Sequence, residues 1–271
     1  MKKIGETLQE ALPGQIRPEN TESLSGGHKC PDCGRQVVPV LIPVLNRWIL
    51  PACSCQVAKY LDEEERRQQQ EKRARVERLF ANSGLGPRFK SCTFENWQKR
   101  PGTEEAFKTA LGYTDKIMTN INTGKGLLFF GEPGNGKSHL AAAVVNKALE
   151  KGFAAVFERV PMLLSRIRST YRNGSPVGEA EIMRVLTQAD LLTLDDAGAE
   201  KWTEWTEPTL YTIIDERYSY KKALIITTNS TLEELEKKIG IRAMDRILEM
   251  CEIVENRGAS FRKERARTRG A

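Results

Sequence analysis

Short apolar runs alternate with amphipathic stretches over the last two thirds of the chain, from about residue 88. Four runs have the length and character of buried strands: 126–131, 154–160, 191–196 and 223–229. The intervening stretches place apolar residues at helical spacing and predict helices over 137–151, 161–171, 179–189 and 206–220. Alternating strands and helices form parallel βαβ units, which bind ligands at the carboxyl ends of their strands. The pattern therefore predicts an α/β domain with a ligand site at that edge.

The first 85 residues lack this pattern. Residues 1–60 are loop-rich, and short strands are expected only around Gln36–Ile42 and Trp48–Leu50. Residues 61–80 carry six acidic and six basic side chains among strong helix formers, including the pair Glu63 and Arg67, and predict a solvated helix. We therefore expect a small module at 1–60, a linker helix at 61–85 and the α/β domain, with a basic tail, at 86–271.

Composition narrows the class of protein. A chain of 271 residues, 39% of them apolar, has enough material for one core domain and a small module. It contains no run near the ~20 apolar residues that a membrane-spanning helix needs. The first residues, MKKIGETLQEALPG, lack the apolar segment of a signal peptide, so we expect a cytoplasmic protein. Residues 257–271 carry six basic groups against Glu264, which indicates either a phosphate-binding arm or a solvated end.

The segment GEPGNGKS at 131–138 satisfies the pattern G-x-x-x-x-G-K-[ST] between a predicted strand and a predicted helix. Glycines let the backbone wrap a triphosphate, and a helix N-terminus offsets its negative charge. Lys137 is expected to contact the β- and γ-phosphates, and the Ser138 hydroxyl to bind Mg²⁺. The predicted ATP-binding residues are Gly131, Glu132, Pro133, Gly134, Asn135, Gly136, Lys137, Ser138 and His139.

Polar side chains follow two later apolar strands. LLTLDD at 191–196 ends in Asp195 and Asp196, and ALIITTN at 223–229 ends in Asn229. We expect Asp195 to hold Mg²⁺ and Asp196 to orient or deprotonate the attacking water. Asn229 is positioned to hold that water. The three groups together predict an ATPase rather than a passive phosphate site.

Four cysteines form a separate cluster. Cys30, Cys33, Cys53 and Cys55 give the spacing C-x₂-C-x₁₉-C-x-C. In a cytosolic chain such clustering indicates a metal rather than disulfides, and the spacing suits a tetrahedral Zn²⁺ site. Because the second pair is tight, His28 is an alternative to one cysteine. The competing interpretation is unconnected buried thiols, as we expect for the isolated Cys92 and Cys251.

These motifs together resemble a known family, the DnaC/DnaI-type helicase loaders of the AAA+ initiator/loader clade. The resemblance covers about residues 86–262 and rests on PRFKSCTFENW, GEPGNGKSHLAAAVVN, LLTLDDAGAEKWTEW, LYTIIDERY and IITTNST. It implies a three-layer AAA+ P-loop domain with a parallel sheet. It also implies an ATP-dependent protein that binds a hexameric replicative helicase and places it on single-stranded DNA. The related IstB-like transposition helpers share much of this pattern but usually lack a zinc module.

The resemblance also implies roles for individual residues. Arg246 looks like the arginine finger that reaches a neighbouring subunit's nucleotide, with Arg242 as the alternative, and Arg262 looks like a sensor arginine that contacts ATP. Many AAA+ proteins have Glu where this chain has Asp196, which favours slow, switch-like hydrolysis. The cysteine module is expected to contact the helicase, with several copies of the chain, six on the helicase, forming a ring or spiral. A zinc-dependent adaptor that binds nucleotide with little hydrolysis is the remaining alternative.

A DNA-binding surface is expected in the helical segment after the second strand. It contains three arginines and a tyrosine that could contact phosphates and stack on bases without reading sequence: Arg166, Arg168, Tyr171 and Arg172. A solvated helix face and the basic tail are the competing interpretations.

Overall fold

The computed structural model describes residues 26–80, 84–171, 177–199 and 203–269. The chain forms two compact units, Met1–Arg67 and Gln68–Ala271, and the boundary falls within one long helix, α2 (Ser54–Leu79). None of the described helices is both long enough and apolar enough to cross a membrane.

The N-terminal unit is built on two short antiparallel hairpins. Strand β1 (His28–Lys29) pairs with β2 (Gln36–Val37), and β3 (Val40–Ile42) pairs with β4 (Arg47–Ile49) around the 3₁₀ turn η1 (Pro43–Leu45). The predicted strand at 36–42 is broken at Pro39, which has no N–H to donate. Among the residues of this unit that the structure describes, the buried core consists of Cys30, Val37 and Cys53. So small a core needs further support.

The second unit contains a five-stranded parallel sheet in the order β6-β7-β8-β5-β9. Its strands are β5 (Gly126–Phe130), β6 (Ala155–Arg159), β7 (Leu191–Ala197), β8 (Ala223–Thr228) and β9 (Cys251–Glu255). The α/β prediction is confirmed. The edge strand β9 was not predicted. Only Cys251 and Val254 of its five residues are buried, and this pattern is too weak to indicate a strand.

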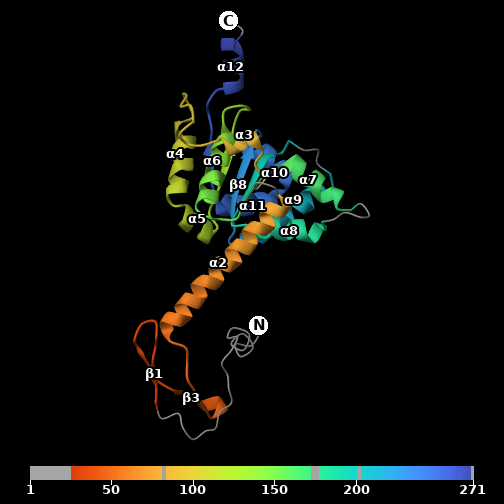
Figure 1. Ribbon diagram of the computed structural model, residues 1–271. Coiled ribbons are helices and arrows are strands. Elements are labelled where there is room, and N and C mark those ends of the chain that lie inside the picture. Colours follow the sequence, from red (N-terminus) through yellow and green to blue (C-terminus); the bar gives the residue numbers. More distant parts are fainter. Residues whose placement is uncertain (1–25, 81–83, 172–176, 200–202, 270–271) are drawn as a thin grey trace. The chain divides into compact units, whose positions relative to one another are not determined.

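Helices cover both faces of the sheet, which confirms the three-layer architecture (Figure 1). One layer contains α3 (Pro87–Lys90), α4 (Glu104–Asp115), α5 (Ile117–Thr123) and α6 (Lys137–Glu150). The other contains the end of α2 with α7 (Val160–Ser169), α8 (Glu179–Gln188), α9 (Thr206–Ser219), α10 (Leu232–Ile239) and α11 (Ile241–Met250). Helix α12 (Phe261–Arg269) follows the last strand. Three consecutive buried alanines, Ala141–Ala143, let α6 approach the sheet closely.

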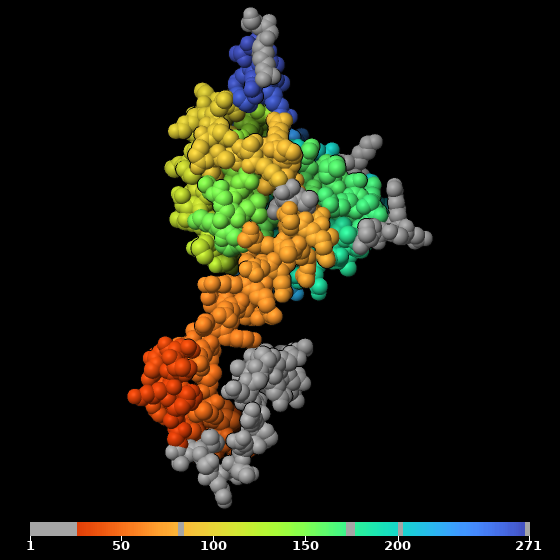
Figure 2. Space-filling view, viewed as in Figure 1, coloured from red at the N-terminus to blue at the C-terminus, as the bar shows by residue number. Residues whose placement is uncertain are grey.

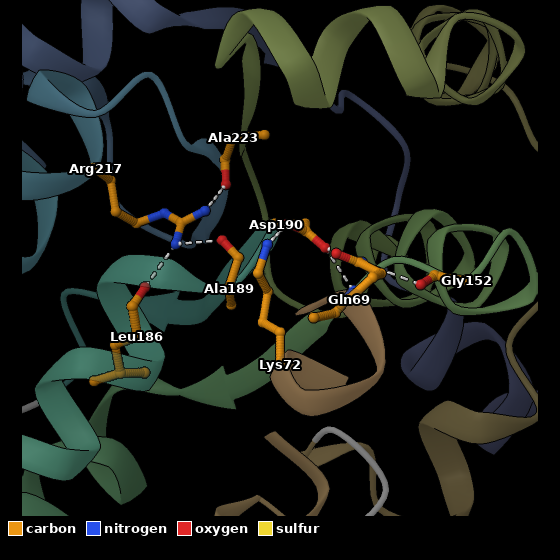
Figure 3. Close-up of polar contacts among 9 residues, drawn as sticks. Gln69, Lys72, Gly152, Leu186, Ala189, Asp190, Arg217 and Ala223 are labelled. Carbon is orange, nitrogen blue, oxygen red and sulfur yellow. Dashed lines mark hydrogen bonds and ion pairs between the residues drawn. The ribbon is translucent and has the colours of Figure 1, made fainter. Parts of the chain in front are cut away.

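The C-terminal half of α2 is anchored to the sheet by a polar cluster (Figure 3). The Asp190 carboxylate, just before β7, accepts hydrogen bonds from Lys72 Nζ (2.6 Å) and Gln69 Nε2 (2.6 Å). Burial alone would raise the pKa of Asp190, but these hydrogen bonds hold it below its usual range. Arg217 is fully buried nearby and donates to the carbonyls of Leu186 and Ala189. The C-terminal part of α2 therefore lies against the sheet domain, beside the end of α6 (Figure 2).

Candidate nucleotide-binding site

The phosphate loop connects β5 to α6, as its sequence context requires. Lys137, the first residue of α6, is only 4% exposed. Its ammonium donates to four neutral oxygens: Gly131 O (2.8 Å), Glu132 O (2.9 Å), Asn135 Oδ1 (3.2 Å) and Asn229 Oδ1 (2.9 Å). Burial lowers the pKa of Lys137 to about 8, against the attraction of Asp196 and Asp195. A buried cation surrounded by neutral acceptors is suited to an incoming phosphate.

The loop glycines are required by close packing. Gly136 has φ +108°, and a Cβ there would lie 2.4 Å from the Trp97 ring. Gly134 has φ +83°, and a Cβ there would lie 2.5 Å from Ser260 Oγ. Left-handed backbone with no room for a side chain can be occupied only by glycine. The loop is therefore a shaped cradle, and this supports its fit to a triphosphate.

Asp195, Asp196 and Asn229 come together at the carboxyl edge of β7 and β8. Asp195 is 1% exposed, and its Oδ1 accepts a 2.7 Å hydrogen bond from the Thr227 hydroxyl. Its Oδ2 is buried without a hydrogen-bond partner among the described residues. Asn229 Nδ2 donates to Asp196 Oδ1 (3.2 Å) while Asn229 Oδ1 accepts from Lys137. The predicted set is thus assembled around the phosphate loop.

The residues present fit a magnesium ion. Burial raises the pKa of Asp195, opposed by hydrogen bonds from the Ser138 and Thr227 hydroxyls. An orphaned carboxylate oxygen beside a hydroxyl is a donor set that Mg²⁺ accepts. Ser138 and Asp195 are therefore the residues that would hold it.

The cleft over the loop measures about 680 Å³ and is walled by residues that the motifs did not assign. Arg100 donates to Asn135 O (2.7 Å) and to Ala259 O (2.6 Å), which ties the loop to the segment before α12. Trp97 contacts the His139 ring edge-on, and His139 Nε2 lies 2.8 Å from Thr93 O. Trp97, Thr93 and His139 stand in stretches quoted for the family resemblance. Arg100 belongs to no motif.

Helix α12 forms another wall of the cleft. The Phe261 amide donates to Gly134 O (2.9 Å), and Arg262 lines the cleft next to the phosphate loop. The cation of Arg262 lies close enough to lower the pKa of Lys137 slightly. Arg262 therefore lies beside the phosphate loop, and its predicted contact with ATP stays a prediction.

The two finger candidates differ in their surroundings. Arg246 lies 3.2 Å from Asp215, with its guanidinium over the Tyr218 ring at 4.5 Å, and Asp215 raises its pKa. Arg242, one turn earlier on α11, is exposed. Neither lines the nucleotide cleft of its own chain.

The four cysteines of the N-terminal unit also come together. The Sγ atoms of Cys30, Cys33, Cys53 and Cys55 all lie within 4.8 Å of one another, and three of the pairs are 3.5 Å apart. Four sulfurs around one zinc at ~2.3 Å would be ~3.8 Å apart, so the set fits Zn²⁺. A hydrogen bond from the Cys55 backbone lowers the pKa of Cys53 to about 7, which favours the thiolate. His28 is not a member of this group within the part of the chain that the structure describes.

The predicted DNA residues do not form one surface. Arg166 stays partly exposed, but its guanidinium is engaged: it donates to Leu79 O (3.0 Å) and pairs with the buried Glu158 (3.0 Å). Arg168 instead lies over the Trp205 ring at 4.7 Å, and Tyr171, 53% exposed, accepts a hydrogen bond from Trp205 Nε1 (3.0 Å). Arg172 lies outside the described residues. Trp205, just before α9, was not singled out from the sequence.

The parallel sheet and the groups that meet at its edge define a P-loop nucleotide-binding domain of the AAA+ class. The family described as IstB-like ATP binding protein matches residues 57–269, and the chain belongs to it. The match begins after the last cysteine of the cluster, so the cysteine module is additional to the family domain.

Helicase loaders are among the proteins to which the chain is similar. The chain is 34% identical over 174 residues to the replicative helicase loader DnaC of Escherichia coli (strain K12), covering 64% of this chain and 69% of the relative. A crystal structure of the DnaC helicase loader superposes with a TM-score of 0.57 at 27% identity, over 64% of this chain and all of that one. The DnaI structure shares the fold, with a TM-score of 0.54 at 19% identity, over 65% and 93%. The predicted resemblance to DnaC/DnaI-type loaders is confirmed.

Proposed function

We propose that this protein is an ATP-dependent loader that binds a hexameric replicative helicase and places it on single-stranded DNA. The observation that carries the proposal is the assembled site, with Lys137, Asp195, Asp196 and Asn229 around one phosphate loop, in a chain 34% identical to a DnaC loader. The site would bind and hydrolyse ATP, and the loader homology points to the use of that ATP.

Each site residue has one task in this proposal. Lys137 exchanges its neutral acceptors for the β- and γ-phosphates, and Ser138 and Asp195 would hold Mg²⁺, which would supply neutralisation of the phosphate charge. Asp196 accepts the proton of the attacking water, and Asn229 orients that water from the other side. Because the Asp196 side chain is one methylene shorter than Glu, we expect slow turnover and a switch-like use of ATP.

The N-terminal unit supplies the surface for the helicase. Large apolar side chains stand exposed on and around the β3–β4 hairpin, including Val44 (92% exposed), Leu45 (67%) and Trp48 (52%). Contiguous apolar surface of this kind marks protein-binding sites. With zinc on its four cysteines, the unit would present this hairpin as a rigid contact for an apolar surface of the helicase.

Single-stranded DNA would contact the second unit at the end of α7. Arg168 stacked on Trp205, beside the exposed Tyr171, offers a cation and aromatic edges that track a strand without reading bases. Arg166 is engaged with Glu158 and contributes to the fold instead.

The test uses the full-length chain with the replicative helicase of the same genome. We expect a complex on size-exclusion chromatography and helicase transfer to circular single-stranded DNA that depends on ATP. Val44→Asp should abolish the complex, and Met118→Asp, at an apolar residue on α5 that is 59% exposed, should leave it intact. If the helicase forms no complex with the wild-type protein, the loader role is wrong, whereas the proposed ATP binding is unaffected.

The family description favours a second candidate, an IstB-like transposition helper, because the matched residues 57–269 cover the ATPase domain alone. Binding to a transposase encoded beside the gene, and not to a helicase, would identify this function. A nucleotide-binding adaptor would instead show no stimulation of ATP hydrolysis by DNA.

A further inference from the structure

The backbone at Asp196 has an unusual conformation. Its φ is +56°, one of three positive values at non-glycine residues in the part of the chain that the structure describes. The pairing of β7 with β8 also shifts between Leu194 and Ala197, so that β7 carries one extra residue at this point. Bulges of this kind re-aim a side chain, and a strained backbone persists only where its surroundings hold it.

Consecutive polar contacts hold this bulge. The Asp196 amide donates to Thr227 Oγ1 (3.0 Å), and the Thr228 hydroxyl donates to Ala197 O (2.7 Å). The next residue, Gly198, accepts a 2.6 Å hydrogen bond at its carbonyl from the ammonium of Lys238. The first two contacts come from the neighbouring strand, whereas the third comes from helix α10.

Lys238 bridges the two segments that flank the reaction centre. Its Nζ also donates to Ser230 Oγ (3.1 Å), directly after Asn229. Helix α10 is itself fixed by a capping box in which Thr231 and Glu234 satisfy each other's backbone. One half-buried ammonium therefore joins the exit of the strand that carries Asp196 to the exit of the strand that carries Asn229, while itself standing outside the nucleotide cleft.

We propose that Lys238 is a positioning residue for ATP hydrolysis, which holds the left-handed backbone at Asp196 and the 3.2 Å contact between Asp196 and Asn229. The proposal rests on the ATPase function proposed above. Without the ammonium, the Gly198 carbonyl loses its anchor, the bulge can relax, and the carboxylate moves away from the attacking water. The phosphate loop, held by Lys137 and Arg100, is not part of this clamp and keeps its affinity for nucleotide.

The test compares kcat with nucleotide affinity in the full-length protein. Lys238→Met keeps the apolar stem and removes the charge, and we expect kcat to fall by about 10- to 100-fold, since small misplacements of a reacting group cost this much. The dissociation constant for ATP should stay within about twofold of wild type, because differential effects on kcat mark groups that act after binding. Lys238→Arg should restore part of kcat, and Lys237→Met, on the exposed side of the same helix, should leave kcat unchanged.

Two outcomes overturn the proposal: an unchanged kcat in Lys238→Met, or an equal loss of kcat and of ATP affinity. Ser230→Ala provides a milder variant that removes the second contact of Lys238, and it should lower kcat in the same direction. Asp196→Asn distinguishes a failure of the proposed ATPase site from a failure of the positioning role of Lys238. If Asp196→Asn hydrolyses ATP normally, the proposed ATPase site is wrong; if it is inactive but Lys238→Met is not impaired, only the positioning role fails.

Discussion

At the scale of single residues, Lys137 links the fold to the chemistry. Its ammonium is buried among four neutral oxygens, so its pKa of about 8 lies within reach of ordinary buffers. A bound triphosphate brings negative charge next to this ammonium and raises its pKa again. ATP binding should therefore take up a proton whenever the pH is above about 8.

The consequence is a pH-dependent affinity for ATP. As the pH rises from 7.5 to 9.5, the free protein loses the proton that binding requires, and we expect the affinity to fall by about 10- to 30-fold. Isothermal titration in buffers of different ionisation enthalpy would measure both the affinity and the proton uptake. Lys137→Ala should not bind ATP, and any binding by Lys137→Arg should be flat over this range, because guanidinium stays charged. A flat profile for the wild type would contradict this assignment.

Asp196 provides the second prediction at this scale. Asp196→Asn keeps the shape of the site and its contact to Asn229 but removes the proton acceptor, so ATP should bind normally while hydrolysis slows by about 10²- to 10⁴-fold. Single-turnover hydrolysis together with equilibrium binding would separate these steps. The control is Glu150→Gln, which removes an exposed carboxylate at the far end of α6 and should not change the rate.

At the scale of elements, we expect the fold of the cysteine module to depend on a bound metal. Three buried side chains cannot hold two hairpins together, so metal binding would supply the folding free energy of this unit. We expect one Zn²⁺ per chain by elemental analysis. A strong chelator should unfold residues 26–53 and leave the cooperative unfolding of the ATPase domain in place. Cys92→Ser should retain the zinc, whereas Cys30→Ser should lose it; a zinc-free native protein would disprove the site.

Helix α7 is the element that we expect to contact DNA. Arg168→Ala should weaken single-stranded DNA binding by about 5-fold or more in the presence of ATP, because it removes a cation and its stacked plane. The slope of the logarithm of the binding constant against the logarithm of the salt concentration should become shallower by about one. Fluorescence anisotropy with a labelled oligonucleotide would measure both.

Two controls test where the DNA surface lies. Arg184→Ala removes an exposed arginine from α8 and should have little effect. The exposed residues Lys263 and Arg267 of α12 do not line the nucleotide cleft, so their joint replacement by Ala tests the basic tail without damaging the ATP site. If only this tail variant weakens binding, the contact lies on α12 and not on α7.

At the scale of the whole molecule, neither Arg242 nor Arg246 reaches the nucleotide cleft of its own chain. If one of them is the arginine finger, we expect it to act on the nucleotide of a neighbouring subunit. We expect Arg246→Ala to bind ATP but not to hydrolyse it in the presence of helicase and DNA. Mixing it with Asp196→Asn subunits should restore hydrolysis, because each variant supplies the group that the other lacks. Arg242→Ala in the same mixture identifies which arginine acts, and no restoration with either would disprove the finger.

The features that could be predicted from the sequence are those whose residues lie close together along the chain. The phosphate loop works through the spacing of Gly131, Gly136 and Lys137, and the spacing of the four cysteines already limits how they can meet. Apolar runs located four of the five strands because nearly all residues of those strands are buried, whereas β9 was missed because only Cys251 and Val254 of its five residues are buried.

The residues that complete each site from distant parts of the chain could be identified only from the three-dimensional structure. Arg100 reaches the phosphate loop across 35 residues, and Trp205 meets Arg168 from the turn before α9, with no shared motif to indicate either contact. The structure also pairs Arg166 with Glu158, since a buried carboxylate needs a partner. The role of Lys238 could not be predicted for the same reason. A lysine on an amphipathic helix is common, and the role of this one depends on its 2.6 Å hydrogen bond to the carbonyl of Gly198, 40 residues earlier.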